Sequence, residues 1–284
     1  MQNEGLIRFG IFSGVLTVMA VWESLAPRRE RVASRWRRSV NNLLLVIVAS
    51  LLVRITPALS AIAAAEWATQ AGFGLLNLWT GGDWLKGPVA VIALDLLVYG
   101  QHVATHRLPI LWRFHRVHHT DLDLDATSGV RFHPVEILVS MGLKVIAVVL
   151  LGVAAEAVLI FEILLNATSV FNHANVRIPI RWDWFLRWFI VTPDMHRVHH
   201  SIRRNETDSN YGFNLPWWDR LFGTYRAQPR DAHENLILGV PELRTAPETV
   251  PLLTMLAMPL QKSVKRNETP IDRSPAMTDS SSTP

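Results

Sequence analysis

Five apolar stretches constrain the fold of this 284-residue chain more than any other feature. A helix needs about 20 apolar residues to cross the hydrocarbon core of a bilayer. The stretches span residues 6–22, 43–65, 88–100, 134–152 and 154–170. We expect the second to be kinked at Arg54 and Pro57, the third to run on to His106 and stop before Pro109, and the last two to form a hairpin near Gly152. The pattern predicts an all-α, multi-pass membrane helical bundle, with a cytosolic helical cap that carries the histidine-rich segments.

The absence of cysteine excludes several kinds of site. Disulfides, iron–sulfur clusters, thiolate-ligated haem and cysteine zinc modules all require that residue. The formal net charge is only +4, yet residues 27–38 hold six arginines directly after an apolar stretch. Beside a membrane span, the positive-inside rule or anionic lipid explains such a cluster better than nucleic acid does. We therefore expect this loop to be cytoplasmic and predict no nucleic-acid partner.

The pentapeptide His-Arg-Val-His-His occurs twice, at residues 115–119 and 196–200. Positions i, i+3 and i+4 share one face of a helix, so each copy is expected to present three imidazoles on one side. His102 and His106 add a further pair at i and i+4. Imidazole is the commonest metal ligand, and eight of them exceed the roughly four to six that one ion needs. The pattern predicts a dinuclear site whose metal stays open among Fe, Zn, Cu and Ni.

Membrane topology brings these histidines to one face. If loop 27–38 is cytoplasmic, the third stretch delivers His102 and His106 to the cytoplasmic side, and the hairpin returns His173 there. The two pentapeptides follow these spans in more polar segments. Transporters usually carry ionisable ligands near the bilayer midplane, so clustering at one end favours chemistry at the membrane surface. A membrane metal-binding protein or transporter without O2 chemistry stays open as the alternative.

Several neighbouring residues limit the kind of metal site. Val103 stands where a zinc protease of the H-E-x-x-H type needs glutamate, and the chain has no Glu-x-x-His motif of soluble di-iron bundles. His133 precedes Pro134 and can be a ligand, a neighbour of a ligand or a helix cap. Arg116 and Arg197 cannot be ligands. They are expected either to contact water or lipid phosphate or to pair with carboxylates such as Asp121, Asp123 and Asp194.

The order H-x-x-x-H, H-x-x-H-H, H-x-x-H-H among membrane spans resembles the fatty acid hydroxylase / sterol desaturase superfamily of integral-membrane non-haem di-iron enzymes. The segments 114–119, 131–134, 172–175 and 211–225 also look like that family. The resemblance covers about residues 96–226. Some relatives carry a further histidine near the position of Arg177, so the ligand set here can be one short. The alkylglycerol monooxygenase branch has a glutamate where Arg107 stands, which weighs against that branch.

The resemblance implies a lipid hydroxylase or desaturase of monooxygenase type, acting in lipid biosynthesis. Two iron ions would activate O2 to attack a C–H bond of a fatty acyl, sterol or related lipid, and zinc could replace iron during expression. Electrons would come from an external donor, which would be a reductase, a ferredoxin or a cytochrome b5-like protein. The implied metal ligands are His102, His106, His115, His118, His119, His173, His196, His199 and His200.

Three regions are expected along the chain. Residues 1–87 would form an N-terminal transmembrane region with the arginine-rich cytoplasmic loop, and residues 88–240 the catalytic domain. Residues 241–284 would be a largely disordered tail, because their end is rich in Ser, Thr and Pro. The compact length and short ends predict a multi-pass protein of a bacterial inner membrane, with the histidines on the cytoplasmic side.

Overall fold

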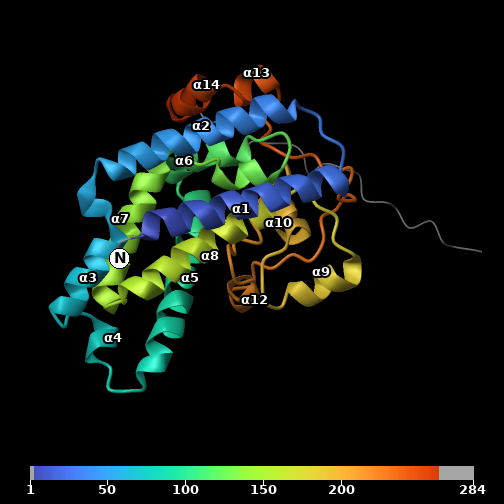
Figure 1. Cartoon of the computed structure of the whole chain (residues 1–284). Helices are drawn as coiled ribbons and strands as arrows, with labels where there is room; N and C mark the ends of the chain where they lie inside the picture. Colours follow the sequence, from blue (N-terminus) through green and yellow to red (C-terminus); the bar gives the residue numbers. More distant parts are fainter. Residues whose placement is uncertain (1–2, 262–284) are drawn as a thin grey trace, which may run out of the picture.

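Five long helices form the bundle in the computed structural model, which describes residues 3–261 (Figure 1). They are α1 (Glu4–Leu25), α2 (Arg35–Arg54), α5 (Asp83–Arg107), α7 (Pro134–Leu151) and α8 (Ala155–His173). Each is long and apolar enough to cross a membrane. Within the described range there is no β-strand, and only isolated bridges join extended segments. The predicted all-α, multi-pass bundle is confirmed, and the chain is an integral membrane protein.

The long helices pack around a shared apolar core. α1 lies against α8, α2 against α7, and α5 against both α7 and α8. The core between them includes the fully buried side chains of Leu94, Val148, Val158 and Phe161. Large apolar side chains on the outer faces, such as Ile47 and Ile146, remain more than half exposed. Such a surface is unfavourable in water, whereas lipid tails cover it readily.

The expectation that residues 43–65 form one kinked span is wrong. α2 ends at Arg54, the short 3-10 helix η1 (Pro57–Leu59) follows, and α3 (Ala61–Gln70) starts anew. Pro57 has no N–H to continue a helix and displaces the preceding Thr56 from helical geometry, to φ −118° and ψ 76°. Ser60 then caps α3 by accepting a hydrogen bond from Ala63 N at 3.2 Å.

The two other expected breaks are confirmed. α5 ends at Arg107, and α6 (Pro109–His119) begins with proline at its first turn, where a missing N–H costs nothing. α7 ends at Gly152, whose φ of 69° and ψ of 45° are left-handed. α8 therefore runs back toward the cap as the second arm of a hairpin, and Lys144 of α7 pairs with Glu162 of α8 at 2.8 Å. The short α4 (Leu75–Leu78) lies in the connection before α5 and contacts α7.

Short helices gather at the end of the bundle where α1 ends and α2 begins (Figure 1). They are η2 (Ala126–Val130), α9 (Ile180–Leu186), α10 (Pro193–His199), α11 (Arg204–Thr207) and α12 (Trp217–Leu221). We call residues 120–133 and 174–240 together the cap. α9 and the residues after it expose aromatic side chains, including Trp182, Trp184, Phe185 and Trp188. Such a surface is typical of a helix at a membrane interface.

The first part of the expected disordered tail is ordered. Residues 241–261 contain α13 (Ala246–Thr249), α14 (Leu252–Ala257) and η3 (Met258–Leu260), which lie beside α2 and α6 (Figure 1). Met255 and Met258 are fully buried with Leu45 and Val117. Apolar side chains that fill this groove offset the entropy of ordering the segment. Residues 262–284 lie outside the described part of the chain.

The arginine-rich loop holds the cap to the bundle. Arg28 pairs with Asp194 at 3.1 Å, and Arg35 pairs with buried Glu23 at 3.2 Å. Arg38 is fully buried and pairs with Asp121 at 2.6 Å. The sequence analysis attributed these arginines to membrane topology or lipid contact. In the structure, several of them form ion pairs within the protein.

Candidate metal centre

Nine buried histidines form two groups where the bundle meets the cap. The first group contains His102, His106, His115, His119 and His199, and the second contains His118, His173, His196 and His200. Within each group, one ring nitrogen of every member lies within 4.8 Å of those of all the others. No member is more than 4% exposed. The structure thus brings together all nine histidines that the sequence analysis named as ligand candidates.

Each pentapeptide contributes to both groups. His115 and His119, at i and i+4, belong to the first group, and the i+3 residue His118 belongs to the second. The other copy reverses this assignment, with His199 in the first group. The three imidazoles of each copy lie together, as expected, with ring centroids no more than 5.4 Å apart, but they divide between the two groups. Successive helical residues are rotated by about 100°, so i+3 and i+4 can address two centres when these lie side by side.

Ring nitrogens within a group approach one another closely. The Nε2 atoms of His106 and His119 are 3.0 Å apart. In the second group, His173 Nε2 lies 3.0 Å from the Nε2 atoms of both His118 and His196. Two imidazole nitrogens bound to one ion at about 2.1 Å and at a right angle are about 3.0 Å apart. These separations therefore fit nitrogens that share a metal ion.

Outward-facing nitrogens are held by fixed acceptors. His102 Nδ1 donates to Tyr211 O, and His173 Nδ1 donates to Ser169 O, each at 2.7 Å. The Nδ1 of His115 is 2.7 Å from Glu136 Oε1. A proton on Nδ1 leaves the Nε2 lone pair directed into the group. The Nε2 atoms of His102 and His115 are buried without a hydrogen-bond partner among the described residues, as expected for atoms that await a cation.

Burial also keeps these imidazoles neutral. Outside the membrane-spanning helices, desolvation lowers the pKa well below the ordinary 6.5, and repulsion between neighbouring histidines lowers it further, for His118, His119, His196 and His200. These side chains are neutral at neutral pH. A neutral imidazole keeps the lone pair that a metal ion needs, whereas a protonated one has lost it.

A buried charge network supports the loop after the first pentapeptide. Arg38 donates to both carboxylate oxygens of Asp121, at 2.6 and 2.8 Å, and to Asp125 at 2.8 Å. Burial would raise the pKa of Asp121, but the charges of Arg38 and Arg131 outweigh it and hold that pKa at about 2. Arg131 also donates to Val117 O at 2.8 Å. This network fixes the chain on both sides of the turn between α6 and η2.

Glu136 and Arg38 are the supporting residues that sequence reasoning missed. Glu136 lies in the first turn of α7, where an acidic residue is ordinary and drew no attention. Arg38 was one of six arginines in a loop assigned to topology. Only the fold shows that Glu136 faces His115 and that Arg38 enters the cap.

The other residues singled out by sequence lie outside both histidine groups. His133 is the N-cap of α7, where its Nδ1 accepts a hydrogen bond from Val135 N at 3.1 Å. Arg197 pairs with Asp194, one of the open possibilities, while Arg116 donates to the backbone carbonyls of Met258 and Gln261. Arg177 is 62% exposed at its side chain and faces Glu234, 3.8 Å away. No histidine fills the place of a fifth member in the second group within the described residues.

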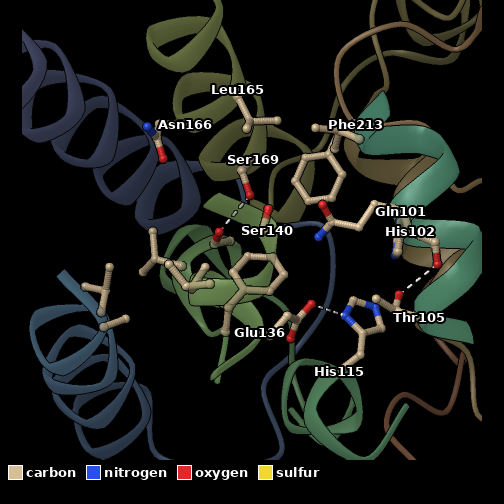
Figure 2. A pocket seen from close by; sticks show the side chains of 17 residues that line it. Gln101, His102, Thr105, His115, Glu136, Ser140, Leu165, Asn166, Ser169 and Phe213 are labelled. Carbon is tan, nitrogen blue, oxygen red and sulfur yellow. Dashed lines mark hydrogen bonds and ion pairs between the residues drawn. The ribbon is translucent and has the colours of Figure 1, made fainter. Parts of the chain in front are cut away.

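A cavity of about 150 Å³ reaches the first histidine group (Figure 2). It lies between α2, α5, α7 and α8, all of them candidate membrane spans. His102, His115 and Glu136 are among its lining residues. Apolar walls come from residues such as Val46, Val98, Ile137, Leu165 and Phe213. An apolar chain can therefore lie in this cavity beside the histidines.

A family model described as fatty acid hydroxylase matches residues 87–224, the part of the chain that holds both groups. This part of the chain matches the fatty acid hydroxylase family. The match runs from the second turn of α5 to Thr224 in the cap, and each of the nine histidines lies inside it. The resemblance stated from the three histidine boxes is thereby confirmed.

Three curated relatives are 26–28% identical to this chain over the parts that align with it. Ornithine lipid hydroxylase OlsE of Rhizobium tropici is 28% identical over 233 residues, which are 80% of this chain and 69% of the relative. Alkylglycerol monooxygenase of Homo sapiens is 26% identical over 53% of this chain and 32% of the relative. A very-long-chain aldehyde decarbonylase of Oryza sativa subsp. indica is 28% identical over 56% of this chain and 27% of the relative. The chain thus spans about a third or less of the last two. No solved structure matches it significantly.

Proposed function

We propose that this protein is an O2-dependent di-iron oxidoreductase that hydroxylates or desaturates a C–H bond of a membrane lipid. The observation that carries the proposal is the pair of buried histidine groups beside a cavity between membrane-spanning helices. The relatives named as lipid hydroxylase and alkylglycerol monooxygenase support lipid oxidation. Their names indicate different lipid substrates, so the class of lipid that this protein oxidises must be inferred from the cavity.

All nine histidines would hold the metal ions. The first group offers five nitrogens and the second four, and nitrogen donors suit iron and zinc alike. Redox chemistry with O2 requires iron of these two, because zinc has no accessible second oxidation state. Zinc can still occupy the site after expression. Two bound iron ions would supply the activation of O2 and the removal of hydrogen from an unactivated carbon.

The protein's own side chains prepare the site for this chemistry. Glu136 and the carbonyls of Tyr211 and Ser169 fix ring orientation and keep a proton on the outer nitrogen. Burial keeps His118, His119, His196 and His200 neutral and excludes water, which would otherwise consume a strong oxidant. The cavity holds the lipid segment next to His102 and His115. The side chains of this protein thus position the imidazoles and the lipid and exclude water.

The overall reaction needs an electron source. Hydroxylation consumes one lipid C–H, one O2, two electrons and two protons, and gives the alcohol and one water molecule. Desaturation uses the same O2, two electrons and two protons, removes two hydrogen atoms from the lipid and gives two water molecules. We propose that a reductase, a ferredoxin or a cytochrome b5-like protein delivers the electrons at the cap.

We further propose that the cap faces the cytoplasm of a bacterial cell, with the bundle in the inner membrane. The arginine-rich loop lies at the cap end, where Arg28 and Arg38 are bound to it. Positive loops stay on the cytoplasmic side. Accessibility of a cysteine introduced at exposed Arg37 to a membrane-impermeant reagent, in intact and opened cells, tests this orientation.

Lipid oxidation by the full-length protein tests the function. Purified protein in bilayers of host lipid receives O2 and a reductant, and mass spectrometry follows gain of one oxygen atom or loss of two hydrogen atoms. We expect product with the wild type and none with His118→Ala or His199→Ala, while His233→Ala, a buried histidine outside both groups, keeps activity. Product formation that survives either of the first two changes would contradict the proposal. Bound metal without oxidation of any lipid would favour the metal-binding or transport alternative.

A further inference from the structure

The cavity beside the first histidine group presents polar groups that an alkyl chain cannot use. Gln101 precedes His102 on α5, and Ser140 lies on α7. Figure 2 shows the Gln101 amide and the Ser140 hydroxyl pointing into the cavity. Neither side chain forms a hydrogen bond with another described residue. Both are therefore available to a ligand.

Glu136 adds an acceptor to the same wall as Ser140. Its Oε1 binds His115, while Oε2 is buried without a partner among the described residues. A buried carboxylate oxygen left unpaired is costly, so a ligand that donates a hydrogen bond is favoured here. A carboxylate only accepts, whereas the amide of Gln101 both donates and accepts. The cavity therefore favours a ligand that carries both a hydrogen-bond donor and a hydrogen-bond acceptor.

The placement of these groups selects among lipid linkages. Gln101 comes from α5, and Ser140 and Glu136 come from α7, so they reach the cavity from two different helices. A trans amide has its N–H and C=O pointing in opposite directions. An ester only accepts, a hydrocarbon does neither, and a hydroxyl places its donor and acceptor on one atom. A secondary amide therefore matches this cavity best.

The size of the cavity shows how much of a lipid can enter. Its volume of about 150 Å³ is smaller than the roughly 300–1,000 Å³ of pockets that enclose a whole ligand. Only a short segment fits, and the polar groups indicate that this segment includes a hydrogen-bonding linkage. We propose that the cavity binds the amide linkage of an N-acylated lipid, read by Gln101 on one side and by Ser140 and Glu136 on the other. This inference rests on the proposed function and names its substrate class.

A pair of matched probes tests the assignment. N-dodecyl dodecanamide and its ester isostere dodecyl dodecanoate differ only in the N–H, and their binding to the purified full-length protein is measured by competition. We expect the wild type to bind the amide about tenfold more tightly, because the ester leaves Glu136 unpaired. Gln101→Leu should remove this preference, and Gln70→Leu, the same change at an exposed position on α3, should keep it. If Gln101→Leu does not fold, Ser140→Ala should reduce the preference several-fold.

Equal affinity of the wild type for both probes, or no binding of the amide to well-folded wild type, would overturn the amide assignment. So would an amide preference that survives in Gln101→Leu. If that variant does not fold, a full preference in Ser140→Ala would have the same meaning. Metal content and lipid oxidation are measured on the same preparations. Amide preference in a protein that holds no iron would contradict the proposed function and leave the assignment standing. Iron and lipid oxidation without amide preference would do the reverse.

Discussion

His118 and His119 are neighbours on α6, yet they belong to different histidine groups. Their ring planes stand at 89°. His118 Nε2 lies 3.0 Å from His173 Nε2, whereas His119 Nε2 lies 3.0 Å from His106 Nε2. His200 approaches both, with ring centroids 4.6 Å from His118 and 4.5 Å from His119. One turn of helix thus supplies both groups and keeps them adjacent.

Removing either neighbour should affect metal binding unequally. His118→Ala leaves three nitrogens of the four in the second group, and His119→Ala leaves four of the five in the first. We expect His118→Ala to lose about half of the bound metal, and His119→Ala to retain more of it. Metal per chain after dialysis against a mild chelator measures this difference. Loss of all the metal in either variant, or no loss in either, would count against two separate ions.

The Glu136 carboxylate should tune metal affinity through His115. Glu136→Ala removes the acceptor for His115 Nδ1 and leaves that ring free to turn. We expect metal affinity to fall about 10–100-fold, as is usual for such outer partners. Glu136→Gln keeps an oxygen acceptor and should lose less. Competition with a fluorescent chelator ranks the variants, and a Glu136→Ala protein with wild-type affinity would show that His115 needs no such support.

The metal-free protein should lose stability as the pH falls below about 6.5. In the unfolded chain histidine has a pKa near 6.5, whereas burial holds the pKa of His118, His119, His196 and His200 well below it in the folded protein. Below that pH the unfolded state binds more protons, so the free energy of unfolding decreases. Melting temperatures of the chelator-treated protein at several pH values check this. A flat profile between about pH 7.5 and 5.5 would contradict neutral buried imidazoles.

Arg38 should be essential for stability although it touches no histidine of either group. Arg38→Met leaves Asp121 and Asp125 buried without their partner, which typically costs about 3–5 kcal/mol. Arg38→Lys should be only a little better, since a single ammonium cannot bind both oxygens of Asp121. Arg37→Met, at an exposed position on the same helix, is the control. Thermal unfolding in detergent gives the comparison, and a wild-type melting temperature in Arg38→Met would refute this role.

Much of the fold could be predicted from residue patterns alone. Apolar length gave the five long helices, and Pro109 and Gly152 gave two of the turns between them. The residue pattern failed to predict structure where burial depends on tertiary contacts. The start of α2 was missed because Arg38 and Asn42, both buried, interrupt the apolar pattern. The ordered residues 241–261 were missed because Met255 and Met258 are buried only in the presence of α2 and α6.

The histidine candidates could be named from sequence because their spacing is unusual, but their grouping could not. Helical geometry alone placed His115, His118 and His119 on one face, and the packing of α6 against the other histidine-bearing segments then divided them. Glu136 and Gln101 carried no signal in the sequence. Their roles come from what they face in the folded chain, His115 and the cavity respectively.

Metal content of freshly purified full-length protein tests the central claim most directly. Elemental mass spectrometry should find about two iron ions per chain, with zinc as a partial replacement, and a marked loss in His118→Ala. The His233→Ala control should keep the wild-type content, because His233 lies outside both groups. Well-folded wild-type protein without stoichiometric metal, or with the same content in His118→Ala, would contradict a metal centre built from these nine histidines.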